Sequence, residues 1–283
     1  MNLKHILQEL SQTDNTDFDK SEQRRDLLKS VTRKLALTAI PFAVGASTEK
    51  AAAKTTNTSL DTLNFLLAFQ HMVAAYYKAA VTAGINNSLF PSTDAQRAFE
   101  TIRDYEAAHA AFLTQTINAA SPNAAVLPNA NGYDYTLDGA LLTFNDYKTM
   151  LAVAQVLEDT AIRVFKGQLD SFVRNNIVTD LLNIQSVKAR CAAHIRQMRT
   201  TIAGGSAKVK PWVTLNQSGV ANTVFAAGYA GEEATMQYGI NITGIGGQAV
   251  SATAASEAFD EPLTQQQSMD ILNMFLYQSQ SRS

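Results

Sequence analysis

The chain has 283 residues, of which 46% are hydrophobic and 17% are charged. A chain of this length can bury a sizeable core, so we expect one main domain with additional tails. The formal net charge is only −2, and no basic stripe with interleaved aromatic residues occurs, which argues against a nucleic-acid partner. Cys191 is the single cysteine. It excludes an internal disulfide framework, so the fold must depend on helix packing.

The first 53 residues have the features of an export leader. Arg24 and Arg25 precede a moderately apolar run at 35–44, which is followed by small residues. This resembles a bacterial twin-arginine signal, with Gln23 in place of the usual Ser or Thr. The resemblance implies export to the periplasm or cell envelope. The apolar run is too short for a transmembrane helix, so we expect no integral span in the mature chain. A solvated amphipathic helix, or an uncleaved leader that tethers the protein to a membrane, is the alternative.

Apolar residues recur at intervals of three and four along the central part of the chain, which is typical of amphipathic helices. After a short linker at 54–59, the pattern predicts a four-helix bundle over 60–204, and hence an all-α fold. The expected helices are 60–83, 92–119, 144–171 and 176–203. The stretch at 121–139 is rich in Pro, Asn and Gly and predicts a crossover or a packed loop.

The C-terminal part of the chain has a different pattern. From 205 to 283 the sequence is rich in Gly, Ser and Thr with isolated aromatic residues, and it lacks the periodicity of a second core. We interpret it as an irregular cover on the bundle that ends in a short amphipathic helix at 264–277. The run 213–250 leaves room for short strands.

Each of the four predicted helices has its apolar stripe interrupted near the middle by polar residues. The interruptions are Gln70 in the first helix, Glu106 and His109 in the second, Glu158 in the third, and Lys188 and Cys191 in the fourth. These side chains point toward the core, where an isolated charge costs several kcal/mol unless it is paired or binds a metal. Glu106, Glu158 and Lys188 must therefore pair with one another or with a bound ion.

The arrangement resembles the ferritin-like family of exported bacterial bundle proteins, whose relatives include desiccation-related proteins. The matching motifs are Leu-Asn-Phe at 63–65, Glu106-x-x-His109, Leu-Glu-Asp-Thr at 157–160 and Lys-Ala-Arg-Cys-Ala-Ala at 188–193. The resemblance covers residues 60–204, with a weaker match at 257–264. It implies a di-iron centre in which the first and third helices each supply a Glu, and the second and fourth each supply Glu-x-x-His.

The ligand set that the resemblance implies is incomplete in this chain. Glu106 and His109 match one Glu-x-x-His motif, and Glu158 matches the carboxylate of the third helix. Three positions are substituted: Gln70 and Lys188 each stand where the family has Glu, and Cys191 stands where it has His. The sequence therefore predicts a degenerate di-iron site.

Two functional hypotheses follow from the substitutions. In the first, Lys188 forms a core salt bridge with Glu106 and Glu158 in place of a metal, and the protein has a structural or partner-binding role without catalysis or cofactor. Its partner would be another ferritin-like protein or a second copy of the chain. In the second, a single iron or manganese ion is held by the ligand set Glu106, His109, Glu158 and Gln70, with Cys191 as a soft fifth ligand. The protein would then be a metal-dependent oxidoreductase or a metal-binding stress protein.

Overall fold

A computed structural model describes the following parts of the chain: 57–173, 175–202, 209–220, 223–237, 239–247 and 249–277. The predicted leader at 1–53 lies outside these described residues, as does the first half of the predicted linker, 54–56. None of the helices in the described ranges is both long and apolar enough to span a bilayer.

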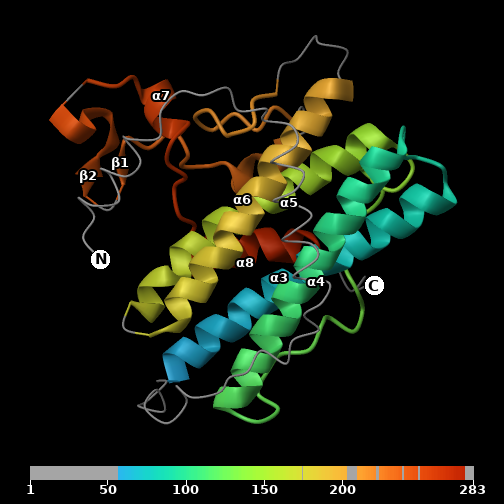
Figure 1. Ribbon diagram of the computed structural model, residues 1–283, viewed down its shortest axis with the longest axis horizontal. Coiled ribbons are helices and arrows are strands. Elements are labelled where there is room, and N and C mark those ends of the chain that lie inside the picture. The colour runs from blue at the N-terminus through green and yellow to red at the C-terminus, as the bar shows by residue number, and fades with distance from the viewer. Residues whose placement is uncertain are drawn as a thin grey trace, which may run out of the picture. The chain divides into compact units, whose positions relative to one another are not determined.

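Four long helices form a bundle, as the sequence predicts (Figure 1). They are α3 (Asn57–Asn86), α4 (Thr93–Ala120), α5 (Tyr147–Gln168) and α6 (Ile177–Ile202). Helix α3 packs mainly against α4, and α5 packs mainly against α6, while α3 also contacts α5. The third helix was expected to reach residue 171, but its last turn is a separate 3-10 helix, η1 (Leu169–Phe172). The all-α fold class is confirmed.

Side-chain caps fix where two of these helices begin. The hydroxyl of Ser92 accepts a hydrogen bond from the Ala95 amide at the start of α4, and the Asp146 carboxylate accepts one from the Thr149 amide at the start of α5. Each cap satisfies an amide that the helix itself leaves without a partner.

The loop between α4 and α5 is a packed loop rather than a flexible connection. The Tyr135 hydroxyl donates to the Met72 carbonyl at 2.6 Å, and the Asp134 amide donates to the Phe275 carbonyl at 2.8 Å. Asn64 on α3 bonds the backbone of the loop through both ends of its carboxamide. The loop therefore joins α3 to the C-terminal end of the chain.

The C-terminal part contains short elements, which are η2 (Thr223–Gly228), β1 (Met236–Gln237), β2 (Ile240–Asn241), η3 (Ile242–Gly247), α7 (Ala252–Ser256) and α8 (Gln265–Met274). Strands β1 and β2 are antiparallel neighbours, with Met236 opposite Asn241. Both η2 and α8 contact α5. The irregular tail ending in a short helix is thus confirmed, and short strands occur within the predicted run. We call residues 209–277 the cover.

Helix α5 is buried on all sides because it lies between the other bundle helices and the cover. Every residue from 153 to 165 is buried. The contact with the cover is very close at Gly167, where an added Cβ would lie 1.9 Å from the Leu263 carbonyl oxygen. Only a residue without a side chain allows the cover backbone to approach α5 this closely.

Candidate polar centre in the bundle

One polar side chain from each bundle helix lies at the middle of the core. They are Gln70 on α3, Glu106 on α4, Glu158 on α5 and Lys188 on α6, and each is 0% exposed. These are the positions that the interrupted stripes predict. We call this group, together with Tyr77, His109 and Cys191, the polar centre.

Lys188 and Glu106 form an ion pair inside the polar centre. The Lys188 ammonium donates a short hydrogen bond to Glu106 Oε2. The same oxygen accepts a hydrogen bond of 2.7 Å from Gln70 Nε2, which also donates to the Glu106 carbonyl at 2.9 Å. The ammonium lies 5.5 Å from the centroid of the Phe165 ring, within range of a cation–π interaction. Glu106 Oε2 is therefore held by donors from two other helices.

The second carboxyl, Glu158, lies outside this ion pair. No hydrogen bond of standard geometry reaches either of its buried oxygens, although the Tyr77 hydroxyl is near enough to lower the pKa of Glu158 slightly against the effect of burial, and the Lys188 ammonium is on Glu106 instead. The sequence predicts a salt bridge in which Lys188 pairs with both Glu106 and Glu158. The structure has the ion pair between Lys188 and Glu106, and Glu158 is a neighbouring carboxyl outside it.

His109 is at the edge of the polar centre. Its Nδ1 lies 3.5 Å from Glu106 Oε1, and its side chain is 12% exposed. Cys191 lies deeper, where its sulfur and one oxygen each of Glu106 and Glu158 are all within 4.8 Å of one another. The structure therefore groups Cys191 with the two carboxylates, while His109 flanks only Glu106.

The surroundings set different charge states for the two carboxyls. Burial alone would raise the pKa of Glu106, but Lys188 and His109 outweigh burial and lower this pKa to about 2. Burial and the negative charge of Glu106 raise the pKa of Glu158 well above its ordinary value. Burial would lower the pKa of Lys188, yet the two carboxyls raise it. The surroundings thus favour the ionised forms of Glu106 and Lys188 and the protonated form of Glu158.

Tyr77 on α3 also belongs to the polar centre, although nothing in the sequence pattern singles it out as a site residue. Its buried hydroxyl makes no hydrogen bond, and burial together with the Glu158 carboxyl raises its pKa well above the ordinary value. Its ring stacks edge to face on Tyr76 with centroids 5.2 Å apart. Tyr77 therefore adds a neutral polar atom to the apolar wall beside Glu158.

The residues present do not fit a di-iron centre. Two iron ions need several deprotonated ligands, whereas this centre contains an ammonium that is bound to one of its two carboxylates. Burial also raises the pKa of the Cys191 thiol, which disfavours the thiolate that binds metals. Gln70 donates a hydrogen bond from its amide nitrogen to Glu106. A metal ion at this position would need an oxygen ligand, and the group that Gln70 turns toward Glu106 is a hydrogen-bond donor.

A second buried polar network lies on another face of α5, about 100° around the helix from Glu158, where the sequence indicated no site. Arg196 on α6 donates to Asp159 twice, at 3.0 Å from Nε and at 2.5 Å from Nη2. The hydroxyl of Tyr229 in the cover donates to the same carboxylate at 2.6 Å. The sequence carries no clear signal for this network, because Asp159 lies about 100° around the helix from Glu158 and could equally face solvent.

Arg163 continues this network toward the C-terminus. Its guanidinium donates to the carbonyls of Gly228 at 2.6 Å, Ala230 at 2.7 Å and Glu261 at 2.7 Å. It also lies 2.6 Å from the carboxylate of Glu232. Since three of these four residues contribute backbone groups, Arg163 fixes the course of the cover over α5.

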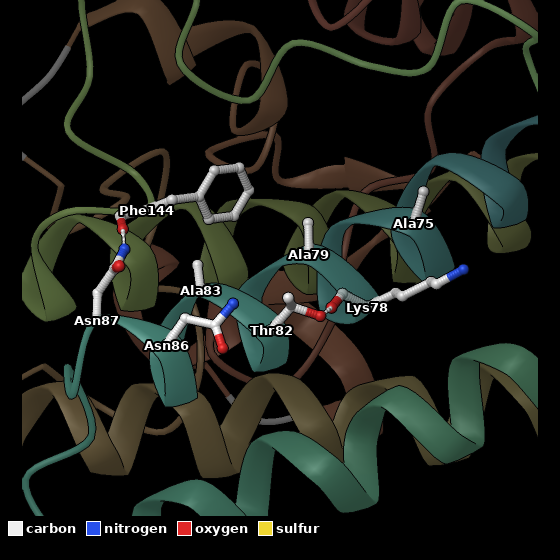
Figure 2. A pocket seen from close by; sticks show the side chains of 8 residues that line it. All are labelled: Ala75, Lys78, Ala79, Thr82, Ala83, Asn86, Asn87 and Phe144. Carbon is white, nitrogen blue, oxygen red and sulfur yellow. Dashed lines mark hydrogen bonds between the residues drawn. The ribbon is translucent and has the colours of Figure 1, made fainter.

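A groove of about 520 Å³ lies on the outer face of α3, outside the polar centre (Figure 2). Ala75, Ala79 and Ala83 form its floor, and Phe144 stands beside it. The Asn87 carboxamide donates to the Phe144 carbonyl at 3.0 Å and joins α3 to the loop there. No member of the polar centre lines this groove, so it does not give access to the buried charges.

Comparison with known proteins identifies one relationship. A family model described as a ferritin-like domain matches residues 58–201, a range that includes α3, α4, α5 and nearly all of α6. A search of curated proteins and a search of solved structures returned no match. The matched range contains every residue of the polar centre, and it leaves the cover outside.

Proposed function

This chain belongs to the ferritin-like domain family, and from this premise we propose that it is a member in which an internal ion pair replaces the metal centre. The bundle then acts as a structural or partner-binding scaffold, without catalysis or cofactor. The observation that supports this proposal is the hydrogen-bonded contact between the Lys188 ammonium and Glu106 in the middle of the core.

The ion pair can perform the structural part of a metal's task. A metal in a bundle neutralises carboxylates and joins helices, and here Lys188 on α6 neutralises Glu106 on α4. Gln70 adds a neutral link from α3. The raised pKa of Glu158 favours its protonated form, which leaves the charges of Lys188 and Glu106 to balance each other without an ion. A balanced, hydrogen-bonded centre holds the helices in register.

A second candidate function is supported by a separate observation, the approach of one ligand atom each from Glu106, Glu158 and Cys191 to within 4.8 Å of one another. Three such atoms match the ligand types of a single transition-metal ion. An ion there would have to displace the protons of Glu158 and Cys191 and break the contact between Lys188 and Glu106. It would make the protein a metal-binding oxidoreductase or stress protein.

Metal analysis distinguishes the two candidates. Protein purified without chelator would be incubated anaerobically with Fe(II), Mn(II) or Zn(II), freed of excess metal, and measured beside Glu106→Ala and Glu158→Ala variants. We expect the wild type to retain no more metal than the variants. About one equivalent that is retained by the wild type and lost in both variants would overturn the ion-pair proposal in favour of a mononuclear site.

We also propose that the protein is exported through a twin-arginine route, on the basis of Arg24, Arg25 and the apolar run that follows them. Expression in a bacterium with a working twin-arginine system, followed by fractionation and intact-mass measurement, tests this. The mature chain should appear in the periplasm after loss of a leader of about the first 53 residues. A variant with both arginines changed to lysine should stay in the cytoplasm at full length. Full-length wild-type protein in the cytoplasm would contradict export.

A further inference from the structure

One segment of the cover carries no charge at all. Between Glu233 and Glu257 the sequence contains no Asp, Glu, Lys, Arg or His. This segment, 234–256, includes β1, β2, η3 and α7, which lie together at one side of the bundle in Figure 1. We call it the neutral lobe. For a surface segment of a protein such a composition is unusual, because charged residues normally make up about a quarter to a third of the surface.

Apolar side chains are exposed on the neutral lobe. Met236 is 56% exposed, Ile240 is 58% exposed, Ile245 is 43% exposed and Val250 is 37% exposed. Single exposed apolar residues are common, but these four occur within one short segment that has no charge, which makes the segment a candidate interaction surface.

The neutral lobe is fixed to the rest of the protein at both of its ends. Before it, Glu232 pairs with Arg163 at 2.6 Å. After it, Glu257 pairs with Lys210 and accepts a hydrogen bond from the Thr214 hydroxyl at 2.8 Å. The charges are thus at the base of the lobe, and the uncharged part lies between them. Fixed ends reduce the entropy that the lobe would lose on binding a partner.

The strands of the lobe have open edges. Strands β1 and β2 pair with each other, and they form a sheet of two strands within the described residues. Both residues of β2, Ile240 and Asn241, are exposed. An exposed strand edge presents backbone groups that can pair with another strand.

We propose that the neutral lobe is the contact surface for a second copy of this chain. A partner that brought charged groups to the lobe would lose their hydration without gaining an opposite charge. The lobe of a second copy meets this requirement, since it is equally uncharged and has the same apolar side chains and open strand edge. A two-fold arrangement would place β2 of one copy antiparallel to β2 of its partner, so that each copy buries the same patch.

Sedimentation velocity and light scattering of the full chain over a range of protein concentrations test this proposal. We expect the wild type to form a dimer whose dissociation constant changes little between low and high salt, because apolar contacts are not screened. Ile240→Lys places a charge on the open strand and should raise the dimer dissociation constant by more than about tenfold. Met236→Gln, on the neighbouring strand, should also raise the dimer dissociation constant.

The matched control is Leu127→Lys, which adds the same charge at a side chain that is 85% exposed in the loop between α4 and α5. It should leave the dimer unchanged. Circular dichroism and thermal unfolding show whether each variant is folded. A wild type that stays monomeric at every concentration would overturn the proposal, as would a dimer that Ile240→Lys and Met236→Gln leave intact. A monomer that binds neutral phosphatidylcholine vesicles through Ile240 would also overturn it and assign the lobe to a lipid surface.

Discussion

At the scale of single residues, the polar centre depends on the contact between Lys188 and Glu106. Both side chains are 0% exposed, so the loss of one leaves the other as an isolated charge in the core. We expect Lys188→Met to lower the free energy of unfolding by about 3–5 kcal/mol, the usual cost of breaking a buried pair from one side. Urea unfolding measures this change, and an unfolding curve like that of the wild type would rule out a structural ion pair.

The double variant Lys188→Met with Glu106→Gln is the control for this substitution. It removes both charges and keeps side chains of similar volume, and such replacements are often neutral or stabilising. We therefore expect the double variant to be more stable than Lys188→Met alone. If the loss of stability in the double variant equalled the sum of the losses in Lys188→Met and Glu106→Gln, the two residues would not be energetically coupled.

The two carboxyls of the centre should respond differently to the same substitution. Burial and the charge of Glu106 raise the pKa of Glu158 and so favour its protonated form, and an amide has nearly the same shape as a protonated carboxyl. We expect Glu158→Gln to change the free energy of unfolding by less than about 1 kcal/mol, whereas Glu106→Gln should cost about 3–5 kcal/mol by stranding Lys188. Urea unfolding of both variants at neutral pH makes the comparison. A larger loss for Glu158→Gln would mean that Glu158 is the ionised partner.

Acid should weaken the ion pair in a defined range of pH. The pKa of Glu106 falls from 4.5 to about 2 on folding, so the folded state binds the proton less tightly than the unfolded state. The carboxylate therefore contributes stability that is complete above pH 4.5 and is lost as the pH falls toward 2. We expect the stability difference between wild type and Glu106→Gln, measured by urea unfolding from pH 6 downward, to shrink below pH 4.5. A difference that does not change with pH would contradict the assigned charge state.

At the scale of elements, the sequence predicts the bundle well and the environment of α5 poorly. Apolar residues at helical spacing predict all four long helices, and the interrupted stripes predict the positions of Gln70, Glu106, Glu158 and Lys188. The stripes define a face of each helix but no distances between side chains, so they could not show which carboxyl binds Lys188. The second buried face of α5 was missed because Asp159 looks like a solvent-exposed residue, and its partner Tyr229 lies in a segment without periodicity.

The contact between α5 and the cover can be tested at Gly167. Alanine normally favours a helix over glycine by about 1 kcal/mol, but an added Cβ here would lie 1.9 Å from the Leu263 carbonyl oxygen. Since that atom belongs to the backbone, the cover itself would have to move. We therefore expect Gly167→Ala to lower the melting temperature. Gly244→Ala is the control, because the nearest atom to its added Cβ is 3.9 Å away, and it should leave the melting temperature almost unchanged. A rise for Gly167→Ala would show that the cover does not rest on α5.

At the scale of the whole molecule, the network around Asp159 should make the bundle and the cover unfold together. Asp159 on α5 holds Arg196 of α6 and Tyr229 of the cover, and Arg196 also donates to the Trp212 carbonyl at 3.2 Å. Trp212 is the only tryptophan of the chain, so its fluorescence reports on the cover, while circular dichroism at helical wavelengths reports on the bundle. Coincident transitions from the two probes indicate one cooperative unit.

We expect the two unfolding curves of the wild type to coincide, because neither face of α5 can be exposed without stranding buried charges. Asp159→Ala should leave Arg196, which is 2% exposed, without its carboxylate and lower the free energy of unfolding by about 3–5 kcal/mol. Both the Trp212 fluorescence and the circular dichroism should show this loss of stability, because the Asp159 carboxylate joins the bundle to the cover. If the fluorescence of Trp212 changed at a lower urea concentration than the helical signal in the wild type, the cover would be an independent unit. The ferritin-like bundle would then be stable without it.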